Sequence, residues 1–435
     1  MKIIIYLFTI LSYSVFAQDV IHVPIDTMST PQNAEIQLRL AYRFQQYNSI
    51  NLNPNDHFDR NIHSPKSVHF LRDTSKFYVN SLEGFKTVVY DAKNYSFIKT
   101  INHHFQVEDS SLFNHEKTVF GYTYKYRKDQ FNIFSGKPVE MCTTHDDRYL
   151  WITYYRRSYD KQAISPSALA IVDTQSDEII RIMPTGPLPK MIASSPDDKF
   201  IAVTQWGDNT VGIIDISSGE PSQFHYLKQF IVGNKLSFNF EKGEDVDRDN
   251  DCGYCLRGTI FTPDSRYLLV GRMGGNGGIA VFDMQKLEYL GTVFGMKINI
   301  RHIVITGDEI FLSSNLTGYV QKANIQEFIT NKLSKPGQDS FFNGWKSCYA
   351  GGKGVRTIST TPDGKYIFAT VNNDSKIVVI RSVDMKLIAT IPCDSYPVGM
   401  DLAPDDKHLV VTSQGKNLEG GNSVMVYEIS YCKTE

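Results

Sequence analysis

The sequence predicts an all-β fold: a seven-bladed β-propeller of four-stranded antiparallel blades, closed by an N-terminal strand. Two observations lead to this prediction. Residues 354–391 contain four short runs rich in β-branched and aromatic residues, separated by turn residues. Four antiparallel strands in roughly 40 residues are typical of one propeller blade. The turn Thr361-Pro362-Asp363-Gly364 inside this segment also recurs along the chain.

The recurring turn has a physical reason for each of its residues. Pro presets φ at the second turn position, and the following Asp accepts hydrogen bonds from backbone N–H groups. Four clear copies begin at Ser195, Thr262, Thr361 and Ala403, and three copies without the Pro begin at Arg72, Thr144 and Thr306. Seven copies favour one closed domain, although 435 residues would be long enough for two or three domains.

The turn pattern resembles that of the YVTN-repeat β-propellers. This group also includes the propeller lactonases and the cytochrome d1-type domain of nitrite reductases. The resemblance covers roughly residues 66–430 and implies the fold. It implies no single function, because this architecture carries enzymes, scaffolds and binding modules.

The N-terminus is typical of a secretory signal peptide over residues 1–17. Met1 and Lys2 precede an apolar run that ends at Phe16, and the small residue Ala17 follows. The run is shorter than the roughly 20 apolar residues of a membrane helix, and no later segment approaches that length. No Cys follows Ala17, so a lipoprotein anchor is not supported. The sequence therefore predicts a periplasmic or secreted protein without a membrane span.

Residues 18–65 form an N-terminal segment that is predicted to include the ring-closing strand. Apolar residues alternate from Ile36 to Phe44, which is the period of a half-buried strand. The last repeat, 397–430, supplies only three strands, and an N-terminal strand would complete its blade. A helix over 34–46 is the alternative, because Ala, Glu, Gln, Leu and Arg also favour helices. Residues 431–435 are a C-terminal tail.

Three long insertions separate the predicted blades, which span 66–101, 138–183, 189–232, 256–294, 300–333, 354–391 and 397–430. Each insertion (102–137, 233–255 and 334–353) is expected to connect the outer strand of one blade to the inner strand of the next. In antiparallel blades these connections emerge on the same side as the loops between second and third strands. The sequence thus predicts one loop-elaborated face.

Alignment of the seven repeats on their turns reveals a row of positive charge near the start of the inner strands. Five of the seven positions are cationic (Lys66, Lys190, Arg257, Arg301 and Arg356), and the other two are Val139 and Val398. Inner strands surround the central channel, so these side chains are predicted to ring its mouth on the loop-elaborated face. Trp206, in a loop of that face, joins them as a candidate ligand-binding residue.

Like charges at one mouth repel one another unless an anionic group offsets them. That group is either a ligand or the acidic loop 244–251, which stands just before Arg257. Asp245, Asp247 and Asp249 of this loop have the spacing of a calcium loop, but it lacks the Gly and the bidentate Glu of an EF-hand. We therefore predict no cofactor and keep calcium as the weaker alternative.

Three of the six cysteines are candidates for a disulfide, as expected for an exported chain. Cys252 and Cys255 form a CxxC in a long loop, and Cys348 stands in another predicted loop. Cys142 lies in a predicted strand and is interpreted as a buried free thiol. Leu256 occupies the position of the His in a haem-attachment motif, which argues against a c-type haem.

These features predict a non-enzymatic, monomeric binding protein whose partner is a protein or an anionic small molecule or polymer. The formal net charge of −2 gives no bulk attraction to nucleic acid. The alternative is a hydrolase like the propeller lactonases, in which His302 and Glu140 would act beside the cationic groups. A d1-type haem domain is a third hypothesis, and the sequence offers no axial-ligand motif for it.

Overall fold

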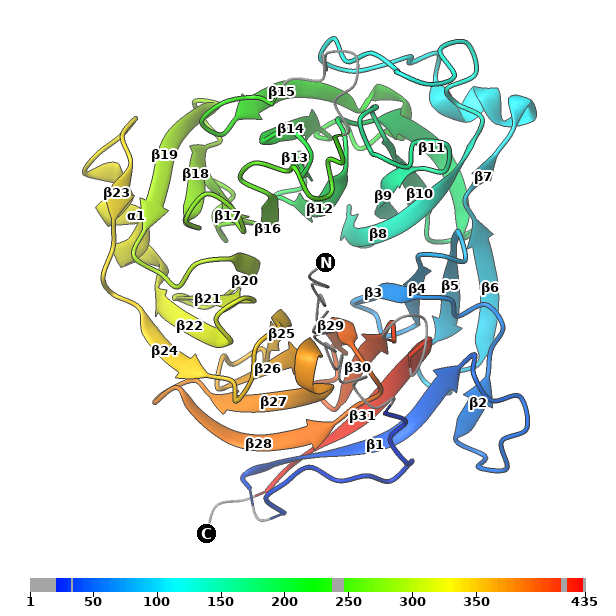
Figure 1. Ribbon diagram of the computed structural model, residues 1–435, viewed down its shortest axis with the longest axis vertical. Helices are drawn as coiled ribbons and strands as arrows, with labels where there is room; N and C mark the ends of the chain where they lie inside the picture. Colours follow the sequence, from blue (N-terminus) through cyan, green and yellow to red (C-terminus); the bar gives the residue numbers. More distant parts are fainter. Residues whose placement is uncertain (1–20, 33, 237–245, 416–420, 433–435) are drawn as a thin grey trace, which may run out of the picture.

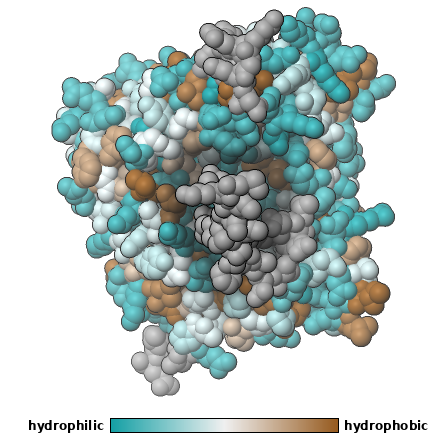
Figure 2. Space-filling view, viewed as in Figure 1, coloured by the Kyte–Doolittle hydropathy of each residue, from teal (hydrophilic) through white to brown (hydrophobic). Residues whose placement is uncertain are grey.

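The computed structural model describes residues 21–32, 34–236, 246–415 and 421–432. Its strands form seven sheets that follow one another around a central axis (Figure 1). The seven-bladed propeller predicted from the repeats is therefore confirmed. The face drawn in Figure 2 is mostly hydrophilic, with hydrophobic side chains scattered over it in small groups.

The blades are numbered in chain order, and their strands are given from the inner to the outer edge. Blade one contains β3 (Pro65–Phe70), β4 (Lys76–Ser81), β5 (Lys86–Asp91) and β6 (Phe97–Asn102). Blade two contains β8 (Phe134–Thr144), β9 (Tyr149–Arg157), β10 (Ala168–Asp173) and β11 (Glu178–Pro184), with the short β7 (His104–Phe105) beside β8. Blade three contains β12 (Pro189–Ser194), β13 (Phe200–Gln205), β14 (Thr210–Asp215) and β15 (His225–Ile231).

The second half of the ring follows the same order. Blade four contains β16 (Leu256–Phe261), β17 (Tyr267–Arg272), β18 (Ile279–Asp283) and β19 (Glu288–Phe294), with β23 (Ser340–Phe341) at its edge. Blade five contains β20 (Ile300–Thr306), β21 (Glu309–Ser314), β22 (Tyr319–Asn324) and β24 (Lys346–Tyr349). Blade six contains β25 (Val355–Thr360), β26 (Tyr366–Val371), β27 (Lys376–Arg381) and β28 (Lys386–Pro392). Blade seven contains β29 (Pro397–Leu402), β30 (His408–Ser413), β31 (Ser423–Tyr431), β1 (Ile36–Gln45) and β2 (Asp56–Phe58).

The recurring turns form the hydrogen bonds that their residues predict. In blade six, Asp363 accepts from the Thr361 hydroxyl at 2.7 Å and from the Lys365 N–H at 3.0 Å. In blade three, Asp197 accepts from the Ser195 hydroxyl at 2.8 Å. Each such turn joins an inner strand to the second strand of its blade, which is why the repeat marks the blade so reliably.

The N-terminal strand closes the ring, as predicted. β1 pairs antiparallel with β31, from Ile36 opposite Tyr431 to Gln45 opposite Ser423. The helical alternative for this segment is wrong, because its alternating apolar side chains belong to a sheet. Leu38 and Leu40 are fully buried in a core that β1 shares with blades six and seven.

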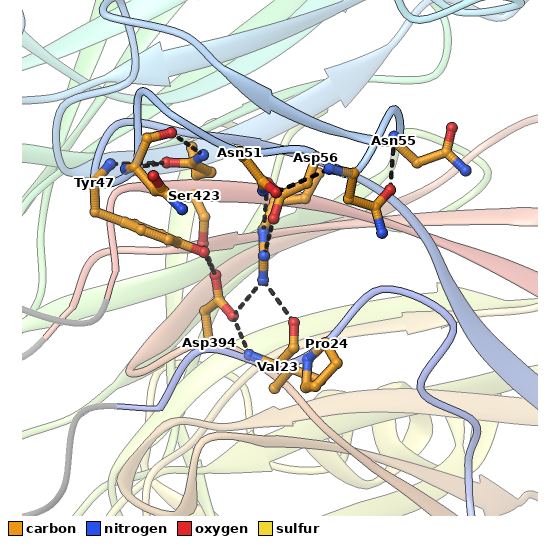
Figure 3. Close-up of polar contacts among 12 residues, drawn as sticks. Val23, Pro24, Tyr47, Asn51, Asn55, Asp56, Asp394 and Ser423 are labelled. Atoms are coloured by element: carbon orange, nitrogen blue, oxygen red, sulfur yellow. Dashed lines mark hydrogen bonds and ion pairs between the residues drawn. The ribbon is translucent and has the colours of Figure 1, made fainter.

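A largely buried polar network, which we call the closure clasp, fixes β1 in place (Figure 3). It consists of Arg43, Tyr47, Asp56, Asp394 and Ser423. The Arg43 guanidinium donates to Asp56 at 3.1 Å and to Asp394 at 3.2 Å. Asp394 also accepts from the Tyr47 hydroxyl at 3.0 Å and from the Ser423 hydroxyl at 2.7 Å. Strand β1 is thus joined by charge to the loop between blades six and seven.

Blade five differs from the sequence prediction. The blade was expected to end at residue 333, but residues 325–333 form helix α1 (Ile325–Leu333). Asn324 caps the start of this helix, because its side chain accepts a hydrogen bond from the Glu327 N–H. The fourth strand is β24, inside the predicted insertion 334–353. The insertion therefore interrupts blade five between its third and fourth strands, so it emerges on the face opposite the loop-elaborated one. Helix α1 forms because Phe328 and Ile329 bury into the core of blades four and five.

The remaining helical segments are short. They are the 3-10 helices η1 (Val107–Phe113), η2 (Pro221–Gln223) and η3 (Asn372–Asp374). Among the described residues, no helix is long and apolar enough to cross a membrane. The predicted signal peptide lies outside the described residues.

Candidate functional site: a cationic mouth

The five cationic residues of the row line a single cavity of about 300 Å³, which we call the cationic mouth. Lys66, Lys190, Arg257, Arg301 and Arg356 are the second residues of β3, β12, β16, β20 and β25. Val139 lines the same cavity, together with Leu82, Glu83, Lys137, Tyr155, Arg156, Asp249 and Gln414. Side chains from different blades thus converge, while their role in binding stays a prediction.

A shared irregularity in the inner strands accompanies this convergence. In all seven blades the pairing of the inner strand with the second strand shifts register near the row position. Such bulges bend a strand and re-aim its side chains. The bulge gives each blade a place from which one side chain can point toward the axis.

The cationic mouth opens on the loop-elaborated face. Glu83 and Gln414 lie in or at loops between second and third strands, and Arg156 stands at the end of a second strand. Asp249 comes from the insertion between blades three and four. Lys137, Tyr155 and Arg156 were not among the predicted site residues. Lys137 stands two residues before Val139 of the row, a signal that could have identified it.

Three cations of the mouth are paired with carboxylates of the protein. Lys190 forms an ion pair with Asp249, which also accepts from the Tyr155 hydroxyl. Arg257 donates to Glu140 at 2.5 Å, and Lys137 lies 2.7 Å from Glu83. Part of the internal ion-pair network considered from the sequence therefore exists, but it involves only one described residue of the acidic loop.

The other three cations of the row, Lys66, Arg301 and Arg356, have no ion pair with any carboxylate of the described residues. Within the described part of the chain, the Nη1 of Arg301 donates to the sulfur of Met273 at 3.4 Å, and its buried Nε has no hydrogen-bond partner. Arg356 lies 5.7 Å from the ring centroid of Tyr396 and is 7% exposed.

The pKa values of Lys66 and Arg301 are shifted by burial and by neighbouring positive charges. Burial, with the nearby charges of Arg356, Arg257 and Arg301, lowers the pKa of Lys66 well below its ordinary value. Burial and the same kind of repulsion, chiefly from Arg356 and Arg257, lower the pKa of Arg301. An anion in the mouth would relieve this repulsion.

Trp206 does not line the mouth but contacts two residues that do, Lys190 and Asp249. Its ring centroid lies 3.8 Å from the Lys190 ammonium, and its Nε1 donates to the Asp249 carbonyl at 3.0 Å. Both contacts hold the Lys190 and Asp249 pair in place. Trp206 is therefore a positioning residue for one side of the mouth.

The candidate catalytic residues, His302 and Glu140, line a second cavity of about 400 Å³ formed by the next residues along the inner strands. Burial lowers the pKa of His302 to about 4, so its imidazole is neutral at pH 7. Its Nδ1 is buried without a hydrogen-bond partner in the described part of the chain. Glu140 is engaged by Arg257. The two side chains share a cavity, and the hydrolase alternative stays a hypothesis.

The described part of the acidic loop binds protein groups. Asp247 accepts from the Asp249 N–H at 3.0 Å and from the Asn250 side chain at 3.1 Å. Asp245 lies outside the described residues. Within the described ranges, no group of three or more His, Cys, Asp or Glu side chains is placed to hold a metal ion. The calcium alternative stays an untested hypothesis.

The cysteines divide into one bonded pair and four free thiols. Cys252 and Cys255 form a disulfide just before Arg257. Cys348, the third disulfide candidate, is a buried free thiol, and the loop expected around it is strand β24. Cys142 is a free thiol whose pKa is raised by burial. The disulfide thus ties the end of the acidic loop to the start of an inner strand of the mouth.

Comparisons with known proteins support the fold and give little on function. No family model matches the chain. Antigen Lp49 of Leptospira interrogans (serogroup Icterohaemorrhagiae, serovar copenhageni, strain Fiocruz L1-130) is 20% identical over 294 residues, which cover 57% of this chain and 61% of that protein. The chain thus matches about three fifths of that relative's length.

Two solved structures share the propeller architecture. Hydrazine synthase of Kuenenia stuttgartiensis matches 88% of this chain and 100% of that chain, with a TM-score of 0.58 and 14% identity. The β-propeller domain of Cps50 (Swd1) from Myceliophteria thermophila matches 85% of this chain and 97% of that chain, with a TM-score of 0.59 and 12% identity. At such low identity these likenesses show the fold alone.

Proposed function

We propose that this protein is an exported, non-enzymatic propeller that binds an anionic ligand, or an anionic group of a partner protein, at the cationic mouth. One observation carries the proposal: Lys66, Arg301 and Arg356 share a cavity and form no ion pair with a carboxylate of the described residues. A buried charge that lacks a partner is costly. A fold that retains three such charges at one place is well suited to receive the missing anion.

Two further observations are consistent with this proposal. The loops of the elaborated face surround the mouth, and loops are where rigid scaffolds usually carry binding residues. The Leptospira relative is named as an antigen. Export rests on the signal-peptide pattern at residues 1–17.

Thermal melting against a panel of anions tests the proposal. The panel contains small anions of different valence and two polyanions, a sulfated polysaccharide and polyglutamate. The wild-type protein is expected to melt at a higher temperature with at least one of them, because an anion that binds only the folded state stabilises it. The triple variant Lys66→Met/Arg301→Met/Arg356→Met is expected to lose this shift.

A matched control removes the same number of charges elsewhere. Arg266, Lys365 and Lys386 are exposed and lie outside the cationic mouth. Their triple Met variant should keep the wild-type shift. Equal shifts in the wild type and in the mouth variant would show that anions bind elsewhere, and the proposal would then be wrong.

A further inference from the structure

Within the cationic mouth, the charges are divided between two halves. The cations that have carboxylate partners, Lys137, Lys190 and Arg257, come from the neighbouring blades two, three and four. Lys66, Arg301 and Arg356 come from blades one, five and six, on the other side of the ring. We call this second part, with blade seven between its members, the positive half.

Among the described lining residues, the blades of the positive half supply one acidic side chain, Glu83 of blade one, and it is paired with Lys137 of blade two. Blade seven contributes the amide of Gln414 to the lining and the uncharged Val398 at the row position. Arg156, a fourth cation without an ion pair in the described part, lines the cavity from blade two. One monovalent anion would leave most of this charge without compensation.

Asp249 indicates which chemical group the mouth accepts. Its carboxylate contacts Lys190 and Tyr155. Burial raises the pKa of Asp249, and the positive charges of Lys66, Arg257 and Arg301 oppose this shift. A carboxylate of the protein itself therefore already lies close to the cations of the mouth. Arg301 and Arg356 present planar donor forks that match carboxylate and phosphate oxygens.

The size of the mouth limits the ligand. A volume of about 300 Å³ corresponds to roughly ten water molecules at ~30 Å³ each. Such a space holds a small molecule and excludes a folded domain.

We propose that the positive half of the mouth binds a small polyvalent oxyanion, a di- or tricarboxylate or a phosphorylated compound with at least two negative charges. Lys66, Arg301 and Arg356 would contact it together. This inference rests on the proposed function and gives the class of its ligand.

Isothermal titration calorimetry of the full chain tests the valence. The probes are pyrophosphate, citrate and acetate, so that the phosphate and carboxylate sources are separated. We expect pyrophosphate or citrate to bind at one site per chain, at least tenfold more tightly than acetate. Arg301→Met and Arg356→Met should each weaken this binding about tenfold or more, because each removes a charge-assisted contact. Lys386→Met, an exposed control, should leave it unchanged.

The conservative variant Arg356→Lys separates charge from fork geometry. It keeps the charge, so it should retain part of the affinity that Arg356→Met loses, provided that both variants melt as cooperatively as the wild type. Acetate binding as tightly as both polyvalent probes would overturn the valence claim and leave the proposed function standing. Binding of the polyanions without binding of pyrophosphate or citrate would also overturn the claim of a small polyvalent ligand and leave the proposed function standing. A lack of response to every anion, small or polymeric, would overturn both.

Discussion

The closure clasp and the cationic mouth both contain a buried arginine, but the surroundings of the two are opposite. Burial acts to lower the pKa of Arg43, and its hydrogen bond to Asp56 together with the charge of Asp394 outweighs that effect, so the pKa is raised. Burial lowers the pKa of Arg301, and Arg356 and Arg257 lower it further.

This difference separates a structural charge from one that is available to a ligand. In the clasp the chain supplies two carboxylates for one guanidinium. In the positive half of the mouth, Lys66, Arg301 and Arg356 form no ion pair with a carboxylate of the described chain. Removing a partner from a compensated buried pair is strongly destabilising, whereas removing an uncompensated buried charge relieves a cost. The two regions should therefore respond in opposite directions to the same kind of substitution.

The largest effect is expected from removing β1. A chain that starts at Lys66 lacks the outer strand of blade seven, so β31 would present an unpaired edge and the core shared with Leu38 and Leu40 would be exposed. Thermal melting should show a far lower transition than that of a chain starting at Gln18, or aggregation in its place. Equal melting temperatures would disprove the role of β1 in closing the ring.

The next largest effect concerns the clasp itself. Arg43→Met leaves Asp56 and Asp394 buried without their cation, and we expect a loss of about 3–5 kcal/mol in the free energy of unfolding. Arg39 is a matched control on the same strand, because it pairs with the partly exposed Asp26 and Glu428. Arg39→Met should cost about 0–1 kcal/mol. Urea denaturation measures both, and similar losses would remove the distinction between buried and exposed pairs.

The mouth should behave in the opposite way. Arg301→Met, measured without added anion, should leave the free energy of unfolding unchanged or raise it by ~1 kcal/mol, since an uncompensated charge is removed. The same denaturation experiment decides this. A loss as large as that of Arg43→Met would show that Arg301 is compensated within the protein, and the comparison of the two regions would fail.

The smallest expected effect is a pH dependence of anion binding. The pKa of Lys66 lies below its ordinary value of 10.5 in the free protein, and a bound anion raises it because the anion favours the charged ammonium. Binding therefore takes up a proton, and pyrophosphate affinity should increase as the pH falls through the interval between the two pKa values. Lys66→Met should flatten this profile. Calorimetry between pH 7 and about 10 measures it, and a flat wild-type profile would contradict the prediction.

The sequence was sufficient for the fold because the information is local. Asp363 accepts hydrogen bonds from Thr361 and Lys365, which are close neighbours in the chain. Each such turn can therefore be recognised in the sequence, and it identifies the blade that contains it. The row at Lys66 and Arg356 followed from the repeats, because equivalent residues of a ring occupy equivalent places. Blade five escaped prediction because helix α1 displaces its fourth strand beyond the expected position.

The pairing of charges could not be read from the sequence, because it joins distant residues. Glu140 lies 117 residues from Arg257, and Asp249 lies 59 residues from Lys190. No local pattern distinguishes these two cations from Arg301, which lacks such a partner. The alternation of β1 indicated a strand, but no local pattern indicates the clasp, because Arg43 and Asp394 are separated by 351 positions in the chain.

The closure of the ring by β1 also determines when this protein can become complete. Arg39 and its partner Glu428 are 389 residues apart, so β1 cannot join the sheet of blade seven until β31 has been synthesised. Contacts of such long sequence separation make folding slow. The closing of the ring therefore depends on β31, the strand that pairs with β1.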